Sequence, residues 1–392
     1  MQIISSSYFS LAITVFILFA HAALAFPRPL YPPPISPELQ PKPEDANATA
    51  GLFRRDIVSQ TNHFLHLVSI SRPRGSTTFQ YPYKYTYDSL AGEGITVYSV
   101  DTGANTDNPE YKSLYLEPRW LFPATVPEGH DSLKNDPLGH GTCVMSLIAG
   151  KTYGVAKKVQ LVIVKVAFPK ARGTDYWKNI EEALDLVYKD IIERKLEGKA
   201  NVNLSVSWSK DALDKAGPQT SDKLKQQIQL LTTVAGVFVA AGNTRSKEGF
   251  STSINRYPAV LAAEIPGMSV VSAARWNGYP AKYTKLGPET ALWAVGNCEC
   301  ASGLSSSQKN GTSFATPLAT GLAAYLMAFP DNGLPAPDGS DRFAVALKQR
   351  MQAMSAYQPE SREPRGCLEG KPLINNQPLP GCSPPTFVSA AA

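Results

Sequence analysis

Short apolar runs and amphipathic stretches alternate through the middle of the chain. Residues 95–100 (ITVYSV), 159–166 (VQLVIVKV) and 236–241 (GVFVAA) are short, apolar and rich in β-branched side chains, which predicts buried strands. Between 177 and 192 the apolar residues recur every three or four positions, which predicts an amphipathic helix that ends near Gly198.

Further elements continue this rhythm. Residues 139–150 (GHGTCVMSLIAG) predict a short helix, and the apolar positions 202, 204 and 206 predict another strand. Ser221 is expected to cap a helix whose apolar face starts at Leu224. Strands that alternate with helices in this way indicate an α/β fold with a mostly parallel central sheet and helices on both faces.

The beginning of the chain has the pattern of a targeting segment. Residues 11–20 are an apolar run, and Ala23-Leu24-Ala25 follows as a cleavage signal, so we expect residues 1–25 to be a secretory signal peptide. A spanning helix needs about 20 apolar residues, and no such run follows, so we expect no membrane partner.

Two Pro-rich segments flank the folded part. Residues 26–58 predict an extended linker or a short pro-segment, and they contain a glycosylation sequon at Asn47. Residues 358–392 predict a tail rich in Cys and Pro. The folded domain is therefore expected over 59–357, which is long enough to bury a large core.

Composition narrows the class of protein. Of 392 residues, 43% are hydrophobic, which excludes a chain that is disordered throughout. The net charge of +5, from 38 basic and 33 acidic residues, is spread along the chain without a Lys/Arg-rich run, so we expect no nucleic-acid partner. Five Cys is an odd number, so at least one thiol is unpaired or pairs between chains.

Three motifs carry candidate chemistry. Asp101 directly follows a predicted strand, His140 opens a predicted helix within Gly-His-Gly-Thr, and Ser313 lies in Gly-Thr-Ser at the start of another helix. Each motif alone is weak, since a lone His is more often structural and a Gly-Thr-Ser can simply cap a helix. Together they place an acid, a base and a hydroxyl in the order Asp, His, Ser, one of the chain orders in which such triads occur.

Longer stretches around these residues match a known family. Residues 85–103 (YTYDSLAGEGITVYSVDTG), 152–161 (TYGVAKKVQL), 239–243 (VAAGN) and 311–327 (GTSFATPLATGLAAYLM) resemble the subtilisin-like serine peptidases, and most closely their proteinase K branch. The resemblance covers most of 60–357 and implies the three-layer subtilisin-like fold, so that 59–357 would be a catalytic domain.

The resemblance also implies a role for each residue. Ser313 would be the nucleophile, His140 the general base and then acid, and Asp101 the group that orients the imidazole. Asn243 would donate to the oxyanion together with the Ser313 N–H. A serine hydroxyl is a weak nucleophile and needs an adjacent base, and histidine titrates near pH 6.5, so it can take and return the proton.

The strand beside which a substrate would bind departs from the family pattern. Ser205, Val206, Ser207 and Trp208 are its expected substrate-binding residues, and Ser207-Trp208 stand where family members usually carry two glycines. Trp208 could line the substrate site or turn away into packing, and the residues leave both alternatives open. Asn203 and Asn310 begin sequons, which we expect to be empty because a glycan would obstruct the site.

The cysteines allow several arrangements. A free, buried Cys143 is the expected odd thiol, which leaves Cys298, Cys300, Cys367 and Cys382 for two bridges with three pairings. A Cys298–Cys300 bridge would be strained. Pairing of both residues with the tail is therefore favoured, and Cys367–Cys382 stays possible.

Two other departures concern the pro-segment and calcium. The family carries a folded inhibitory propeptide, whereas the thirty residues from 26 to 55 are too few and too Pro-rich to fold alone. Arg275 and Trp276 stand about where the proteinase K branch has an acidic calcium ligand. We therefore expect no cofactor and no metal, with calcium possible but supported by no specific residue.

These observations favour a secreted, extracellular, monomeric serine endopeptidase that acts on protein or peptide substrates. The alternative is a catalytically silent secreted protein that keeps the subtilase fold as a binding module. A third interpretation is a structural protein that acts through its Pro-rich segment and tail.

Overall fold

The computed structural model describes residues 56–61, 64–71, 83–124, 134–166, 174–244, 251, 253–276 and 278–355, with the backbone alone at 174–176 and 214. The predicted signal peptide, the Asn47 sequon, most of the Pro-rich segment and the tail lie outside these residues. The strand β1 begins at Ile57, two residues before the expected start of the folded domain.

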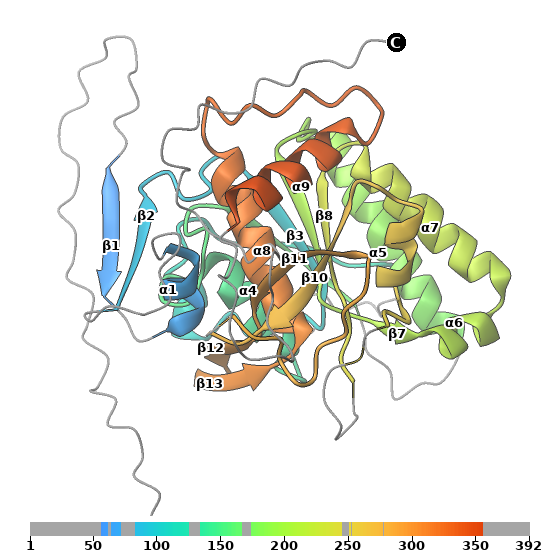
Figure 1. The fold of residues 1–392 in the computed structure, drawn as a ribbon, viewed down its shortest axis with the longest axis horizontal. Coiled ribbons are helices and arrows are strands. Elements are labelled where there is room, and N and C mark those ends of the chain that lie inside the picture. The colour runs from blue at the N-terminus through green and yellow to red at the C-terminus, as the bar shows by residue number, and fades with distance from the viewer. Residues whose placement is uncertain are drawn as a thin grey trace, which may run out of the picture. The chain divides into compact units, whose positions relative to one another are not determined.

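The centre of the fold is a parallel sheet of seven strands (Figure 1). In spatial order they are β11 (Thr290–Val295), β10 (Met268–Ala274), β8 (Gly236–Ala240), β6 (Ala200–Leu204), β3 (Thr96–Asp101), β5 (Gln160–Lys165) and β4 (Arg119–Leu121). All six neighbouring pairs run parallel. The predicted parallel sheet and α/β class are therefore confirmed.

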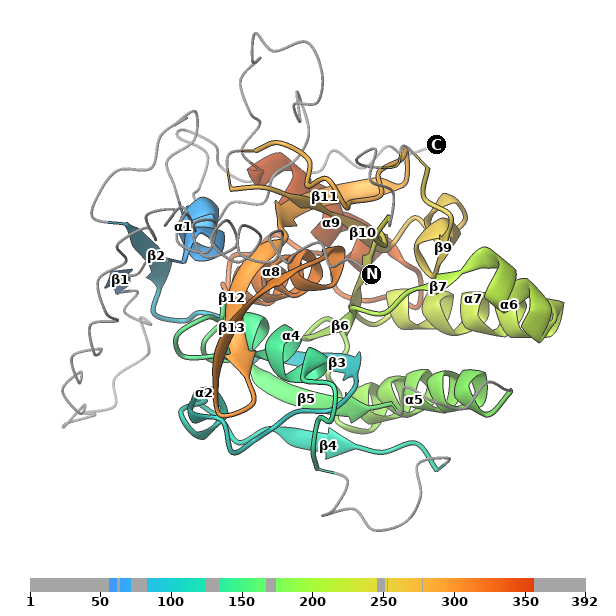
Figure 2. The same cartoon turned by 90° about the horizontal axis from the view of Figure 1, so that it is seen from below.

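Helices cover both faces of this sheet, as Figure 2 shows. One face packs against α1 (Leu65–Ser71), α4 (His140–Ala149), α8 (Thr312–Met327) and α9 (Arg342–Met354). The other packs against α5 (Thr174–Glu193), α6 (Lys210–Ala216) and α7 (Pro218–Thr232). The described residues also form the short helix α2 (Pro109–Lys112) and the 3-10 helix η1 (Ala259–Ala263).

The strands divide their side chains between two cores. In β5, Leu161 and Ile163 join the core under α4 and α8, whereas Val162 and Val164 join the core under α5 and α7. Successive side chains of a strand point to opposite faces, so a strand buried on both faces must be apolar throughout. This explains the continuous apolar runs in the sequence.

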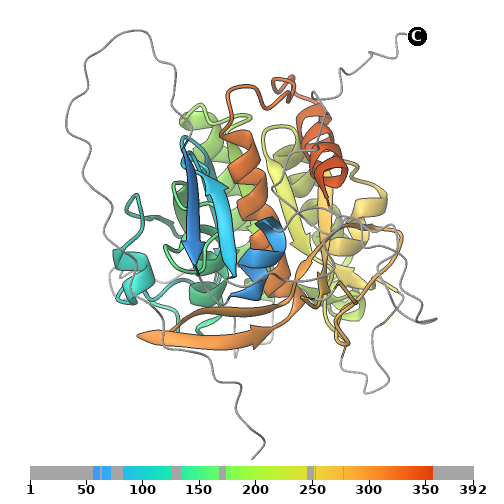
Figure 3. The same cartoon turned by 60° about the vertical axis from the view of Figure 1, so that its left-hand side comes forward.

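Within the described part of the chain, three small antiparallel pairs lie outside the central sheet. They are β1 (Ile57–Thr61) with β2 (Lys84–Asp88), β12 (Asn297–Ser302) with β13 (Ser305–Asn310), and β7 (Trp208–Ser209) with β9 (Arg256–Tyr257). The first pair and the long β12–β13 hairpin are seen side-on in Figure 3.

One predicted helix start is wrong. The helix α7 begins at Pro218 after Gly217, and Ser221 lies one turn inside it, where its Oγ donates to the Pro218 carbonyl at 2.9 Å. Proline at the first position of a helix is favoured because its missing N–H would have no helical partner there. Pro218 therefore marks the start more strongly than the serine.

Candidate active site

Asp101 and His140 meet at the carboxyl end of the central sheet. Asp101 is the last residue of β3 and is fully buried. Its Oδ1 lies 2.7 Å from Nδ1 of His140, the first residue of α4. The same oxygen accepts from the Thr102 N–H at 2.7 Å, which holds the carboxylate in place. The imidazole is thus oriented by a buried, ionisable partner.

Asp136 holds the start of α4 against this strand end. Its Oδ1 accepts from the Gly139 N–H at 3.0 Å and from Thr102 Oγ1 at 2.6 Å. Its Oδ2 accepts from the Thr142 N–H and Oγ1, both at 2.7 Å. A carboxylate at a helix N-terminus satisfies N–H groups that have no helical partner and complements the helix dipole.

The sequence reasoning missed Asp136. An acidic residue a few positions before a helix start was the available signal.

Two glycines flank His140 at the start of α4, and each has a different structural reason. Gly139 precedes α4 with φ of 66°, a left-handed conformation that glycine adopts without strain. A Cβ on Gly141 would collide with the Gly103 carbonyl oxygen. The Gly-His-Gly spacing therefore sets how closely His140 comes to Asp101.

Charges around His140 favour its protonated form. Burial by itself lowers the pKa of His140, but the charge of Asp101 and its hydrogen bond raise that pKa more, and Asp136 adds to the rise. Lys309 acts in the opposite sense. The net result is a pKa above the ordinary value of 6.5, so this histidine is a stronger base than a free imidazole.

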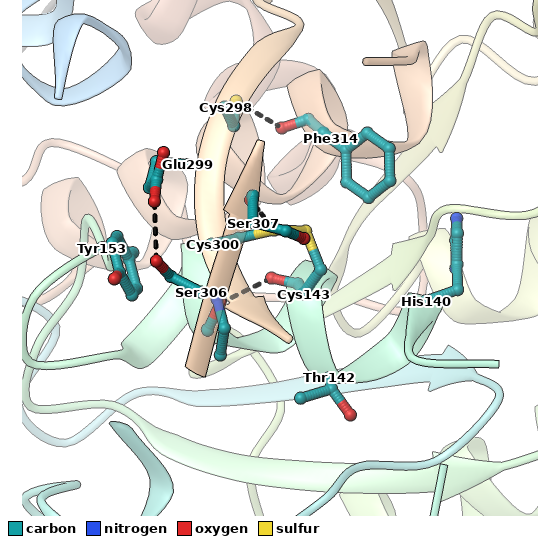
Figure 4. Close-up of a disulfide and its surroundings, with 12 residues drawn as sticks. His140, Thr142, Cys143, Tyr153, Cys298, Glu299, Cys300, Ser306, Ser307 and Phe314 are labelled. Atoms are coloured by element: carbon teal, nitrogen blue, oxygen red, sulfur yellow. Dashed lines mark hydrogen bonds between the residues drawn. A yellow bond between two sulfur atoms is a disulfide. The ribbon is translucent and has the colours of Figure 1, made fainter. Parts of the chain in front are cut away.

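Ser313 lies at the start of α8, the helix that contacts His140 through Phe314. It is the second residue of the helix and is partly exposed. The ring of the next residue, Phe314, has its centroid 5.4 Å from that of His140. Both side chains are drawn in Figure 4. The helix continues through a Pro at 317, which has no N–H to donate to the Ser313 carbonyl four residues before it.

Asn243 is joined to the same helix start. It is exposed and follows β8, and its Oδ1 accepts from the Thr312 N–H at 3.0 Å and from Thr312 Oγ1 at 3.1 Å. A Cβ on Gly311 would lie 3.4 Å from Asn243 Nδ2. These two bonds orient the side chain of Asn243. Its NH₂ group is the donor that it can offer to another molecule.

The four predicted substrate-binding residues continue from the end of β6. Ser205 and Val206 are buried, and Ser205 Oγ accepts from Asn203 Nδ2 at 3.0 Å. Ser207 is partly exposed. Trp208 is 9% exposed and packs edge-on against Trp177, with ring centroids 5.1 Å apart. Trp208 is therefore packed against another aromatic side chain, and its role in substrate binding stays a prediction.

The comparisons with known proteins assign the family. Residues 92–353 match the model of the Subtilase family (Peptidase_S8). The chain belongs to the subtilase family. Over 266 residues this subtilase is 35% identical to Subtilisin-like protease 2 of Trichophyton rubrum and, equally, to that of Arthroderma benhamiae. Each alignment covers 64% of this chain and 54% of the relative, so the chain spans about half the length of the curated relatives it matches.

A solved structure agrees on the fold. The crystal structure of a cold adapted subtilisin-like serine proteinase matches this subtilase with a TM-score of 0.57 and 22% identity. The match covers 80% of this chain and 98% of that one. At this identity the likeness shows the fold, and the predicted three-layer subtilisin-like fold is confirmed.

The prediction that Cys143 is the free thiol is wrong. Cys143 forms a disulfide with Cys300, and among the cysteines that the structure describes Cys298 is the free, buried thiol (Figure 4). The pairing of Cys300 with the tail is therefore wrong as well, whereas Cys367 and Cys382 lie outside the described residues. The bridge joins α4 to β12, two elements that are 157 residues apart at these positions. Burial raises the pKa of the Cys298 thiol far above its ordinary value.

The remaining expectations concern metals and membranes. Across the described ranges, no group of three or more His, Cys, Asp or Glu side chains could hold a metal ion. The helices in the described part of the chain include none that is long and apolar enough to span a membrane.

Proposed function

We propose that this subtilase is a serine endopeptidase that cleaves peptide bonds through an acyl-enzyme. The observation that carries the proposal is the 2.7 Å contact between buried Asp101 and His140, beside the helix start that bears Ser313. A hydroxyl becomes a nucleophile at neutral pH only with such an oriented base.

Each step follows from the groups present. Ser313 Oγ attacks the scissile carbonyl carbon while His140 Nε2 takes its proton, and Asp101 stabilises the imidazolium that forms. The carbonyl oxygen, now negative, accepts from the Ser313 N–H and from Asn243 Nδ2. The C–N bond then breaks as His140 returns the proton to the leaving amine, and water releases the acyl group by the same route.

The substrate backbone would lie along residues 205–208. The 205–207 stretch follows a buried strand and leads to the β7–β9 pair, so an extended peptide can add its main chain beside it. This binding mode is independent of side-chain identity. We further propose secretion after removal of residues 1–25, a linker or pro-segment at 26–58, a catalytic domain at 59–357, and a monomeric protein.

The test is covalent labelling with a fluorophosphonate probe, which reacts with a serine activated by its base and oxyanion donors. The protein is expressed as the chain without residues 1–25, and folding is confirmed by a cooperative thermal transition. Wild type is expected to be labelled, and Ser313→Ala is not. Ser305→Ala is the matched control, because Ser305 is exposed on the β12–β13 hairpin and only its Oγ–Ser302 carbonyl bond is lost.

Failure of folded wild type to be labelled would overturn the peptidase proposal and support the silent binding module. Equal labelling of wild type and Ser313→Ala would remove Ser313 from its role. Hydrolysis of casein, measured on the same three proteins, then tests turnover as distinct from a single covalent step.

A further inference from the structure

The β12–β13 hairpin is joined to both helices that carry the proposed catalytic residues. Its strand β12 is bonded to α4 through the Cys143–Cys300 disulfide, one turn after His140. Its strand β13 ends at Asn310, and α8, which bears Ser313, begins two residues later. The hairpin is thus fixed beside the place where His140 and Ser313 would act.

One face of this hairpin is turned toward the two helices. Cys298 and Cys300 share that face, because both are buried and they lie two residues apart in one strand. Cys300 is bonded to α4, and Cys298 Sγ donates to the Phe314 carbonyl of α8 at 3.7 Å (Figure 4). Lys309 stands directly opposite Cys298 in the antiparallel pair. Because residues opposite each other have side chains on the same face, the side chain of Lys309 also faces α4 and α8.

The charge of Lys309 reaches His140. The ring of Phe314, whose carbonyl contacts Cys298, has its centroid 5.4 Å from that of His140. Burial and then the charge of Asp101 have the largest effects on the pKa of His140, and the charge of Lys309 lowers that pKa. The strand register and this charge effect agree in placing Lys309 near the imidazole.

The ammonium of Lys309 has no carboxylate partner. The residue is partly exposed, and its side chain forms no hydrogen bond or ion pair with any residue in the described part of the chain. The carboxylates near His140 have other partners. Asp101 is bound by His140 and Thr102, and Asp136 accepts four hydrogen bonds. Lys309 can therefore offer a charged donor to a bound molecule.

The hairpin lies where the second half of a cleaved substrate would lie. In the proposed reaction the part before the scissile bond lies along residues 205–208, and its carbonyl is held at Asn243 and Ser313. The part after the scissile bond begins at the amine to which His140 returns the proton. In Figures 1 and 2 the strand β7 lies to the right and the hairpin farther to the left. An extended peptide that reaches the site along residues 205–208 therefore continues toward the hairpin.

We propose that Lys309 is a specificity-determining residue that favours glutamate or aspartate among the first two residues after the scissile bond. Successive side chains of an extended peptide point to opposite sides, so one of these two residues faces the hairpin. A carboxylate there accepts a charge-assisted hydrogen bond from the ammonium, whereas a cationic side chain is repelled. The proposal rests on the peptidase function above and adds a substrate class to it.

The first experiment measures kcat/KM on peptides that differ only in having Glu, Gln or Lys at the first or the second position after the scissile bond. Gln matches Glu in shape and lacks its charge. At one of the two positions wild type is expected to prefer Glu over Gln by about fivefold, as for a favourable ion pair at a solvent-accessible site. In Lys309→Gln this ratio falls to near one, Lys309→Arg keeps most of it, and Lys309→Glu prefers Lys over Glu.

Lys178→Gln is the matched control, because it removes the same charge from an exposed position on α5, which packs on the other face of the sheet. Its Glu:Gln ratio is expected to equal that of wild type. Raising the salt concentration should reduce the wild-type ratio and leave the ratio of Lys309→Gln unchanged. A cooperative thermal transition verifies that each variant is folded.

The second experiment separates this proposal from catalysis. In Ser313→Ala, which cannot form the acyl-enzyme, binding of the same intact peptides is measured by calorimetry. Tighter binding of a Glu peptide than of its Gln partner, lost on adding Lys309→Gln, supports the acidic preference even if wild type fails to turn over. A Glu:Gln ratio near one at both positions in kinetics and binding, or a ratio unchanged in folded Lys309→Gln, overturns it.

Discussion

The residues proposed for the chemistry and those proposed for selecting the substrate are held in different ways. Asp101, His140 and Ser313 lie at the ends of the buried elements β3, α4 and α8. Asp136 joins the start of α4 to the end of β3 through four hydrogen bonds. The proposed substrate side depends on the two-residue strands β7 and β9 and on Arg256, whose Nε donates to Ser207 Oγ.

This difference separates two kinds of change. A substitution on the chemical side removes an interaction that every substrate needs in the transition state, so it lowers all rates by one factor. A substitution on the substrate side alters which side chains are accepted or how firmly the short strands pack. The predictions below test that separation, from the largest expected effect to the smallest.

Asp101→Asn should cost the most activity. The amide keeps the shape of the carboxylate but stabilises the wrong imidazole tautomer and cannot stabilise the imidazolium. We expect kcat to fall about 10⁴-fold, by the same factor for two peptides of different sequence, with little change in thermal stability. Steady-state kinetics on both peptides measure this. A loss that differed strongly between the two peptides would break the separation.

Trp208→Ala should act on stability. The side chain is buried and packs against Trp177, so its removal leaves a cavity that costs about 3–5 kcal/mol of unfolding free energy. Denaturant unfolding measures the loss, and Trp208→Phe, which keeps an aromatic ring there, should recover part of it. An unchanged midpoint with an altered substrate preference would instead put Trp208 in the substrate site.

Asn243→Ala should lower kcat by about 10²–10³ and change KM little, because its NH₂ would bind the oxygen only once it is negative. Asn243→Asp is the informative companion. It keeps the oxygen that accepts from Thr312 and loses the donor, so it should be at least as inactive while folding normally. Recovery of activity in Asn243→Asp would argue that Asn243 acts only by holding Thr312.

The pH dependence of kcat/KM is the smallest of the effects expected here. The base must be neutral to act, and the pKa of His140 is raised, so kcat/KM should fall as the pH drops through a value above 6.5. In Asp101→Asn the burial effect remains while the charge of Asp101 is gone, so the pKa of His140 should fall. NMR titration of the His140 ring measures both values; an unchanged pKa would mean that Asp101 does not control the base.

The strands and motifs that were predicted correctly are those that depend only on neighbouring residues in the sequence. The strands near 95–100, 159–166 and 236–241 are apolar throughout because each is buried on both faces, and this pattern needs no knowledge of partners. Of the glycines beside His140, Gly141 allows a close approach to the Gly103 carbonyl oxygen and Gly139 adopts a left-handed conformation, and both show in a short motif.

Errors and omissions arose where a residue's role depends on a distant neighbour. Cys298 and Cys300 are alike in sequence, and only the packing of β12 against α4 decides that Cys300 bonds to Cys143. No sequence pattern indicates a role for Arg256, because its partner Ser207 is 49 positions away.

The sequence by itself determined the order of strands and helices, the subtilase resemblance and the identity of the candidate Asp, His, Ser and Asn. Local hydrophobic periodicity and short glycine motifs encode these properties. Only the tertiary structure decided that Cys143 pairs with Cys300, that Trp208 packs against Trp177 and that Arg256 donates to Ser207. Those contacts join segments that are far apart in the sequence. They meet because of how the sheet and its helices pack, and no local sequence pattern encodes that packing.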